Sequence, residues 1–435
     1  MDIASSRHAD FSQLTVVHQD EFSQRPVLCA LQRRSLWLLA AVSPFVFIEP
    51  SPYEFAFLVV LVLFIGTGLR FPPAALSLVA ILGVLNLGYT VGAIHLFEKQ
   101  EVLYWILTSW YLALTAIFFA LLLSENTGER LDALMRGYRF AAVVVSLLAI
   151  AGYFNLIPGA QEQLTLYSRA RGTFKDPNVL GAFLVLPAIY CLQQMIDEQA
   201  GRALRNGVAF ALIGLAVLLS FSRAAWGILA ITAMASVALN FLTTTSARKK
   251  VRILILMMLA AGVAAVMLSV LLSFDAFANI FKERASLVQS YDTGRFGRFG
   301  RHVLGAEMAL DYPFGIGPLQ FSRFFPEDTH NSFLNAFMSG GWLSGVTYPL
   351  LIVTTLLLSL RSQFVAAPWS QASRVLFITF IGLASESFII DTDHWRHFFM
   401  LIGAVWGVSI ASSRMANTNG AFESHAVGEL NWTTR

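Results

Sequence analysis

Cationic and imidazole side chains gather in the longest polar interruption of an otherwise apolar chain. This segment, 291–346, contains Arg295, Arg298, Arg301, Arg323 and His330. A guanidinium group can bind two phosphate oxygens at once, and it stays charged throughout the physiological pH range. Several of them converging on one point could hold a pyrophosphate and stabilise it as it leaves. Such stabilisation of developing charge is often the largest catalytic contribution.

His330 stands immediately before an apolar run, so we expect it at the N-terminus of a helix, with Asp328 or Thr329 as the cap. The positive end of a helix and nearby arginines both favour the neutral imidazole. A neutral imidazole can take a proton from a sugar hydroxyl, which is the work of a general base. The alternative is an interfacial histidine bonded to a backbone carbonyl. Asn331 would orient the histidine or cap the helix.

The composition indicates a membrane protein. The chain has 435 residues, of which 56% are hydrophobic and 13% charged, and its mean hydropathy is +0.63. Soluble domains carry about 25% charged residues. The net charge of +3 gives no reason to expect nucleic-acid binding. Cys29 and Cys191 lie too far apart to suggest a disulfide framework or a Cys-x-x-Cys metal pair, and the first 34 residues show no cleavable signal peptide.

Apolar runs predict an all-α integral membrane protein with about twelve transmembrane helices. The run 207–242 is too long for one helix, so we expect a break at Ser222-Arg223. The membrane domain would cover 35–412, with a large outer loop at 274–330, and tails would lie at 1–34 and 413–435. The predicted spans are 35–49, 52–69, 72–94, 101–124, 137–157, 178–196, 207–221, 224–242, 252–273, 331–360, 373–390 and 395–412.

The distribution of Lys and Arg predicts that both termini are cytoplasmic. Eighteen of the thirty Lys and Arg residues then fall on the inner side, and the short basic loop 244–251 is the firmest single indicator. The outer cations concentrate at Arg169, Arg171, Lys175, Arg223, Arg396 and the segment 282–323.

These outer cations suggest an anionic ligand, because topology alone would remove arginine from the outer side. The alternative is that a long loop is translocated across the membrane regardless of its charge. Its arginines would then pair with the loop's own acidic residues, Glu283, Glu307, Asp311 and Glu327. That alternative does not account for Arg223, which stands in a short turn between two apolar helices. A charge in such a place is a functional candidate.

Residues 297–311 read as a helix lying on the membrane surface. Phe299, Val303, Ala306 and Leu310 form one apolar stripe, and three arginines follow the neighbouring arc. The basic side would face headgroups or the mouth of the bundle. Pro313, Gly315 and Gly317 would end the helix in a turn, and no strand precedes them as a nucleotide-binding loop requires.

The outer turn 391–397 reads DTDHWRH, so Asp391, Asp393, His394 and His397 could ligate a divalent metal. The alternative is that these polar residues have no ligand and only keep a short connection between two helices solvated. We expect no metal site.

Four segments, in order, resemble the O-antigen ligase and Wzy polymerase superfamily of bacterial envelope glycosyltransferases, and together they cover about 171–346. Asp176 departs from the Asn usual in that family, and Arg295, which follows Thr293-Gly294, is the favoured counterpart of the family's Gly-Arg. The segments are RGTFKDPNVLGAFL (171–184), LLSFSRAAWGILA (218–230), TGRFGRFGRHVLGAEMALDYPFGIGP (293–318) and HNSFLNAFMSGGWLSG (330–345).

The resemblance implies a helical bundle of the GT-C class in the bacterial inner membrane. Its periplasmic cavity would accept a glycan on undecaprenyl pyrophosphate and transfer it to a hydroxyl of another glycan or of lipid A-core. The transfer would be metal-independent, cofactor-free and inverting. Membrane lipid, a chain-length regulator and a flippase are the implied partners. Arg223 and Arg295 would bind the pyrophosphate, His330 would be the base, and the substrate-binding residues would be Arg171, Arg298, Arg301 and Asn331.

The main alternative is a polytopic transporter or flippase for a lipid-linked saccharide. Transporters tend to show internal repeats, broken helices and charges near mid-membrane. Here Asn86 and Glu386 are the evident polar residues inside spans, and the charges concentrate at one face. A scaffold without chemistry would have no need of Arg223.

Overall fold

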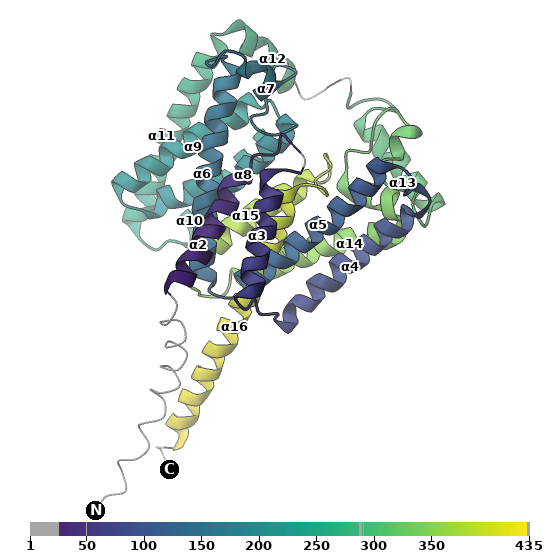
Figure 1. Cartoon of the computed structure of the whole chain (residues 1–435). Helices are drawn as coiled ribbons and strands as arrows, with labels where there is room; N and C mark the ends of the chain where they lie inside the picture. Colours follow the sequence, from purple (N-terminus) through teal and green to yellow (C-terminus); the bar gives the residue numbers. More distant parts are fainter. Residues whose placement is uncertain (1–25, 49, 287–288, 290, 433–435) are drawn as a thin grey trace, which may run out of the picture.

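The chain is helical almost throughout, in agreement with the predicted fold class. The computed structural model describes residues 26–48, 50–286, 289 and 291–432, with side chains to 418. Within these residues the strands are a two-residue antiparallel pair, β1 (Thr165–Leu166) and β2 (Arg169–Ala170). Helices far apart in sequence lie side by side around a common core (Figure 1).

Helices lie at all twelve predicted positions. Nine of the described helices are long and apolar enough to cross a membrane, when α4 is taken together with the 3₁₀ turn that precedes it; α2, α3 and α15 are shorter. The twelve are α2 (Pro26–Val42), α3 (Pro52–Gly66), α4 (Leu76–Gly92), α5 (Gln100–Leu123), α6 (Thr127–Tyr153), α8 (Pro177–Asp197), α9 (Ala200–Leu219), α10 (Arg223–Thr243), α11 (Ala247–Leu272), α14 (Ser332–Ser362), α15 (Ser370–Glu386) and α16 (Arg396–Trp432).

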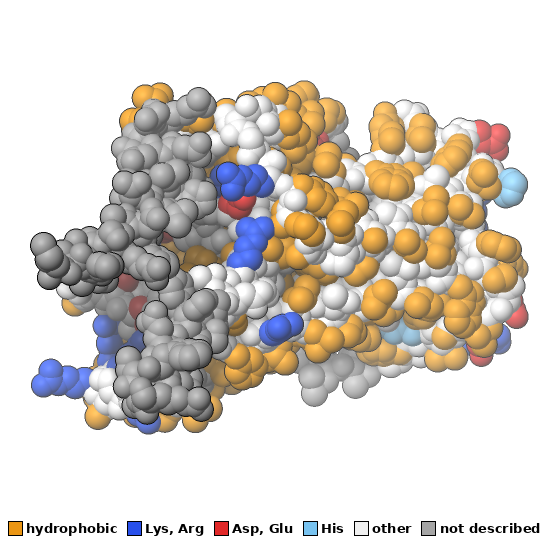
Figure 2. Space-filling model, turned by 90° about the horizontal axis from the view of Figure 1, so that it is seen from below, with side chains coloured by type: hydrophobic (Ala, Val, Ile, Leu, Met, Phe, Trp, Pro, Cys, Tyr) orange, Lys and Arg blue, Asp and Glu red, His pale blue; other side chains and the backbone are white. Residues whose placement is uncertain are grey.

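The outer surface of the bundle is apolar, as expected for a protein embedded in a membrane. Helix α11 is exposed along almost its whole length, although it is the most apolar of the nine long helices. Hydrophobic side chains also spread over much of the surface visible in Figure 2. Exposing them to water would be costly, since apolar burial contributes about 25 cal/mol per Å².

Two helices extend beyond the predicted spans. Helix α2 begins at Pro26, nine residues before the predicted span, and it ends at Val42 because Pro44 disfavours helical backbone in the residue before it. Helix α16 runs on to Trp432, so most of the predicted tail 413–435 is helical. Residues 1–25 of the predicted N-terminal tail lie outside the described part of the chain.

The predicted break at Ser222-Arg223 is confirmed. Helix α9 ends at Leu219 and α10 begins at Arg223. The Ser222 hydroxyl caps α10 by accepting from the Ala225 amide, and Phe221 adopts φ +48° in the turn. Arg223 is therefore the first residue of a helix, at the end of the bundle rather than at mid-depth.

The connection between α11 and α14 carries two further helices, α12 (Asp275–Ala285) and α13 (Arg298–Asp311), and one 3₁₀ turn, η3 (Phe321–Arg323). Short elements elsewhere are α7 (Ala160–Leu164), η1 (Pro73–Ala75) and η2 (Ile94–Leu96). Helix α13 is the predicted surface helix. Its apolar stripe is exposed, whereas Arg301 on the opposite side is buried, so the basic side faces the bundle.

Helix α14 is broken at Gly340-Gly341, and the loop after α13 fits into the break. The amides of Ile316 and Gly317 both donate to the Met338 carbonyl, at 2.7 and 3.1 Å. The Trp342 amide donates back to the Pro313 carbonyl at 2.9 Å, and its indole N–H to Ala309 at 2.9 Å. These bonds satisfy backbone groups that the break releases, and they fix α13 against the first half of α14.

Replacing Gly341 should test this junction. Gly341 has φ +61° and ψ −156°, and a Cβ atom there would lie 2.2 Å from the Pro313 carbonyl oxygen. That backbone conformation costs a residue with a side chain about 1–3 kcal/mol, and the clash adds to this. We expect Gly341→Ala to lower the thermal unfolding midpoint of the detergent-solubilised protein, whereas Gly262→Ala on α11, where a Cβ meets nothing within 4 Å, should not lower it.

Candidate active site

Six connections between the helices meet at one end of the bundle, and the predicted site residues lie there. Contacts between distant segments join them: Arg223 to Asp292, His330 to Asp391, Arg323 to Glu101, and Arg396 to Glu54. In Figure 1 this end carries α7, α12 and α13 and is opposite to the end of α16. We call it the site end.

Four arginines surround Tyr291 and Asp292, and we call Arg169, Arg223, Arg284 and Arg298 the arginine cluster. Asp292 is buried and pairs with two of them, at 2.7 Å to Arg223 and 3.5 Å to Arg298. Both guanidinium groups also lie against the Tyr291 ring, at 5.5 and 5.6 Å from its centre. The Tyr291 hydroxyl accepts from Arg223 and Arg284, at 3.0 and 3.2 Å. Asp292, and Asp176 near Arg169, do not balance four guanidinium groups, so the cluster keeps an excess of positive charge.

Arg169 and Arg284 are the members of the cluster that the sequence did not single out as site residues, and Arg169 is the more buried of the two. Its side chain donates to the Ser220 carbonyl and to the Asn178 side-chain oxygen, both at 2.8 Å. It therefore ties the turn before α10 to the start of α8. Burial, with Arg284 nearby, lowers the pKa of Arg169. Arg171, predicted as substrate-binding, instead donates to the Gln163 carbonyl at 3.1 Å and lies outside the described contacts of the cluster.

Arg298, and not Arg295, is joined to Arg223. Arg295 precedes α13 in an exposed turn, with its guanidinium 5.9 Å from the centre of the Phe296 ring. Helix α13 begins at Arg298, so its register turns Arg298 and Arg301 toward the bundle. Arg223 and Arg298 are thus joined through Asp292, whereas Arg295, which the sequence grouped with Arg223 on the pyrophosphate, lies outside these contacts.

Arg301 holds the segment that carries His330. Its side chain is buried and donates to the carbonyls of Phe296 and Asp328, at 2.7 and 3.1 Å. It also pairs with Glu327 at 2.7 Å. These three contacts direct the guanidinium to the protein itself, so Arg301 positions residues 327–330.

His330 forms a pair with Asp391 across 61 residues of chain. Its Nδ1 lies 3.2 Å from the Asp391 carboxylate, and its backbone adopts φ +48°. The hydrogen bond to Asp391 is the main cause that raises the pKa of His330, against the opposing effects of burial, Arg298 and Arg301. The predicted lowering of this pKa was wrong, because Asp391 outweighs the arginines.

The His330–Asp391 geometry nevertheless suits a general base. A carboxylate at Nδ1 favours the tautomer with hydrogen on Nδ1, which leaves Nε2 free to accept a proton. Nε2 is 3.9 Å from Glu327, beyond hydrogen-bond distance. Asp391 would then stabilise the imidazolium that forms, as the acid does in a catalytic triad.

Asn331 caps helix α14, one of the two roles that the sequence suggested for it. Its side-chain oxygen accepts from the amides of Phe333 and Leu334, at 3.0 and 3.1 Å, and its amide nitrogen donates to the Phe388 carbonyl at 3.0 Å. Ser332 adds two bonds to the same turn, donating its amide to Ser387 and accepting from the Thr392 amide. The start of α14 is therefore fastened to the segment that carries Asp391.

A cleft of about 330 Å³ opens beside Asp391. It combines carboxylates with aromatic rings, and we call it the acidic cleft. Burial, with Asp391 nearby, raises the pKa of Asp328 at its edge. The lining residues are Glu101, Tyr104, Trp105, Thr108, Leu319, Asp328, Asn335, Asp391, Asp393, His394 and Trp395.

The residues of the turn 391–397 are divided among different contacts. Asp391 bonds His330, Asp393 accepts from Asn335 at 2.7 Å, and the His394 ring packs on Trp105 with centres 4.0 Å apart. Across the described residues, no group of three or more His, Cys, Asp or Glu side chains has the arrangement to hold a metal ion.

No family model matches this chain, and no curated protein matches it. The family resemblance noted in the sequence therefore stays a prediction, and the function is argued below from the geometry of the site end.

Arg301 and Arg295 form a matched pair for a stability test. Arg301→Ala removes three partly buried charge-assisted contacts, and a hydrogen bond to a charged group can contribute about 1.5–3 kcal/mol. We expect it to lower the free energy of unfolding by at least about 2 kcal/mol. Arg295→Ala removes an exposed side chain and should change it little. Equal effects in denaturant titrations of the purified protein would contradict the positioning role of Arg301.

Proposed function

We propose that this protein is a membrane glycosyltransferase that moves a glycan from a lipid-linked pyrophosphate to an acceptor hydroxyl. The donor is an oligosaccharide on undecaprenyl pyrophosphate, as in O-antigen ligases and Wzy polymerases. One observation carries the proposal: the His330–Asp391 pair is close to both the arginine cluster and the acidic cleft, because Arg298 acts on the His330 charge and Asp391 lines the cleft. A site for an anionic leaving group, a base and a site for hydroxyl groups would therefore lie next to one another.

We propose that all twelve helices span the bacterial inner membrane. Short spans are tolerated within a bundle, which suits α2, α3 and α15. An even number of crossings puts both termini on one side, and the basic residues at the start of α11 assign that side to the cytoplasm. The site end, including the segment 274–330, then faces the periplasm.

The arginine cluster is the proposed donor site. Arg223 and Arg298 are held by Asp292 and Tyr291, so their guanidinium groups are already in place before a ligand binds. A diphosphate would meet guanidinium groups from two separate segments of the chain. Preorganised positive charge of this kind lowers the barrier to departure of the pyrophosphate. Arg295, in its exposed turn, is not needed for this contact.

His330 is the proposed base. Its Nε2 takes the proton of the acceptor hydroxyl while that oxygen attacks the anomeric carbon of the donor sugar. The bond from the anomeric carbon to the phosphate oxygen breaks, and its electron pair leaves with the pyrophosphate. Attack from the face opposite to the leaving group inverts the configuration at that carbon. Asp391 holds Nδ1–H and stabilises the resulting imidazolium.

The acidic cleft is the proposed acceptor site. Trp105 and Tyr104 offer faces for sugar rings, and Asn335 and Asp393 offer groups that bond hydroxyls. The carboxylates repel phosphate, so the donor and acceptor would be kept in separate places. The acceptor is another glycan in a polymerase or lipid A-core in a ligase. Length profiles of the lipid-linked glycan on gels, with and without the protein, distinguish these two.

Replacement of His330 separates an enzyme from a transporter. We expect His330→Ala to reduce glycan transfer in reconstituted membranes by about 10²–10⁴-fold, the usual contribution of a general base, while donor binding is retained. Arg298→Lys and Arg223→Lys should also reduce transfer, because a point charge does not reproduce the fork. Arg295→Lys is the control and should retain transfer. Full transfer by His330→Ala would refute the base assignment.

The pH dependence of transfer tests the His330–Asp391 pair. Only the neutral imidazole accepts a proton, and Asp391 raises the pKa of His330 above its usual 6.5. Activity (kcat/KM) should therefore rise with pH through a limb centred above 6.5. Asp391→Asn removes the raising charge, so the limb should move to lower pH while the maximal rate falls. A limb that does not move would show that another group titrates.

A further inference from the structure

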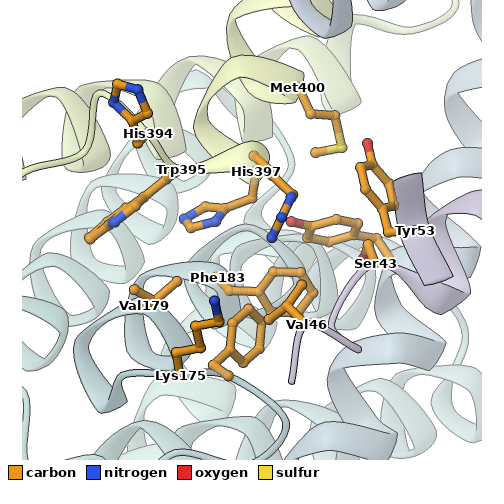
Figure 3. A pocket seen from close by; sticks show the side chains of 13 residues that line it. Ser43, Val46, Tyr53, Lys175, Val179, Phe183, His394, Trp395, His397 and Met400 are labelled. Carbon is orange, nitrogen blue, oxygen red and sulfur yellow. The ribbon is translucent and has the colours of Figure 1, made fainter. Parts of the chain in front are cut away.

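Two cavities of the bundle differ in how they are lined. One, of about 200 Å³, lies at the site end beside the first turn of α16, and Figure 3 shows the rings of Phe183, Trp395 and His397 around it. The cations of that cavity, Lys175 and Arg396, have partners within the protein, so they serve the framework of the site end. The other cavity is apolar and opens on the outer surface of the bundle.

The apolar cavity is a groove of about 490 Å³ between α11 and the wall formed by α8, α9 and α10, and we call it the apolar groove. Every described residue that lines it is apolar. Leu192 and Ile196 of α8 are buried and form its floor, and the exposed Met234 of α10 and Met257 of α11 flank it. The groove uses the second halves of α8 and α10 and the first half of α11, so it lies at the end of the bundle opposite to the site end.

Helix α11 is held near its two ends and packs little in between. It lies at the outer edge of the bundle (Figure 1), and its buried residues are Ile253 and Leu271. These two residues are about 27 Å apart along the helix. Protein interiors are normally packed without spaces as large as the groove. An apolar space offers no hydrogen bonds to hold water, so lipid chains would fill the groove in a membrane.

The depth of the groove matches one leaflet of a membrane. Its lining on α11 runs from Ile253 to Ala260, which is about 10 Å along the helix axis. Half of the hydrocarbon core of a bilayer is about 15 Å thick. The groove therefore suits part of one acyl chain. Lipid tails are as apolar as the side chains of the groove, so a chain alone gains little there and the headgroup would decide which lipid binds.

Basic residues stand at the mouth of the groove, where a headgroup would lie. The Lys250 ammonium is 5.4 Å from the centre of the Phe241 ring, and Phe241 lines the groove. Arg252 donates to the carbonyl of Met195, another lining residue, at 2.8 Å. Arg248 precedes Arg252 by four residues, so it lies on the same face of α11, one turn nearer the start of the helix, and it is exposed.

Two of these cations remain available to a ligand. Lys249 is engaged with Asp197 at 2.6 Å, and Arg252 with the backbone at the end of α8. Arg248 and Lys250 have no acidic partner in the part of the chain that the structure describes. An anionic headgroup is therefore favoured over a zwitterionic one at this position.

We propose that the apolar groove binds one phospholipid with an anionic headgroup, whose acyl chain lies in the groove and whose phosphate contacts Arg248 and Lys250. The stretches 197–206 and 244–252 around this position carry six basic and two acidic residues, so the local charge adds to the attraction. Basic pockets between helices at a membrane surface bind such headgroups, with about a fivefold gain in affinity for each Lys or Arg. The lipid fills the space between α11 and α8 and stabilises the position of α11, and this role does not depend on glycan transfer.

Lipid binding by the full chain in a neutral detergent tests the proposal. Native mass spectrometry should show one phosphatidylglycerol bound about 25-fold more tightly than phosphatidylcholine with the same chains, since two cations contribute about fivefold each. Arg248→Gln and Lys250→Gln should each weaken phosphatidylglycerol binding about fivefold and leave phosphatidylcholine binding unchanged. Arg361→Gln, at the end of α14 and outside the groove, makes the same change of charge and is the control.

A second pair of variants tests the groove itself. Ala260→Phe places a ring in the groove and should lose most of the phosphatidylglycerol binding, whereas Ala264→Phe, one turn further along α11 and outside the lining, should retain it. Phosphatidylglycerol should also raise the thermal unfolding midpoint of the wild type, because a ligand of the folded state stabilises it. The double variant Arg248→Gln, Lys250→Gln should not show this rise.

Three outcomes would overturn the inference. The first is equal binding of the two lipids by the wild type. The second is unchanged phosphatidylglycerol binding by the double variant, with a thermal unfolding midpoint that equals that of the wild type when no lipid is added. The third is a dimer that carries no bound lipid, which would show that a second copy of the chain covers the groove. Arg248 is exposed, so Arg248→Gln alone remains informative even where the double variant fails to fold.

Discussion

The hydrogen bonds between the start of α14 and the turn 387–392 are the constraint on which the site depends. Asn331 and Ser332 use their side chains and backbone to bind this turn, and as a result Asp391 reaches His330. The bonds are buried, so loss of one would leave a polar group without a partner, at a cost of about 1–3 kcal/mol. The distance between His330 and Asp391 is thus determined by how the start of α14 packs against the end of α15.

Helix α13 supplies the second half of the arrangement. Its register brings Arg298 to Asp292 and Arg301 to residues 327–328, while its other side exposes an apolar stripe. The break in α14 at Gly340-Gly341 receives the loop that follows α13, so the helix cannot rotate freely. The arginines at the site end are therefore held by ordered elements, although the connection between α11 and α14 that carries them is the longest between two long helices.

The sequence was sufficient for features that depend on local pattern. Apolar runs predicted helices at twelve positions, and a charge within one such run predicted the turn before α10. Features that depend on distant contacts were not predictable. The direction of the His330 pKa is set by Asp391, which is 61 residues away. Which arginine faces inward depended on α13 beginning at Arg298, and the three evenly spaced arginines do not reveal that start.

The short hairpin shows why residue type alone cannot assign a role. Arg169 and Arg171 are two residues apart and chemically identical, yet Arg169 enters the arginine cluster and Arg171 turns to a backbone carbonyl. Strand β2 ends at Ala170, so the alternation of a longer strand, which would put both side chains on one face, does not apply. The buried Arg169 donates to the turn between α9 and α10 and to the start of α8, so it fixes how these segments approach each other. In this chain the same guanidinium chemistry is used both to build the site end and, in our proposal, to bind the diphosphate, and burial together with the partners of each arginine distinguishes the two uses.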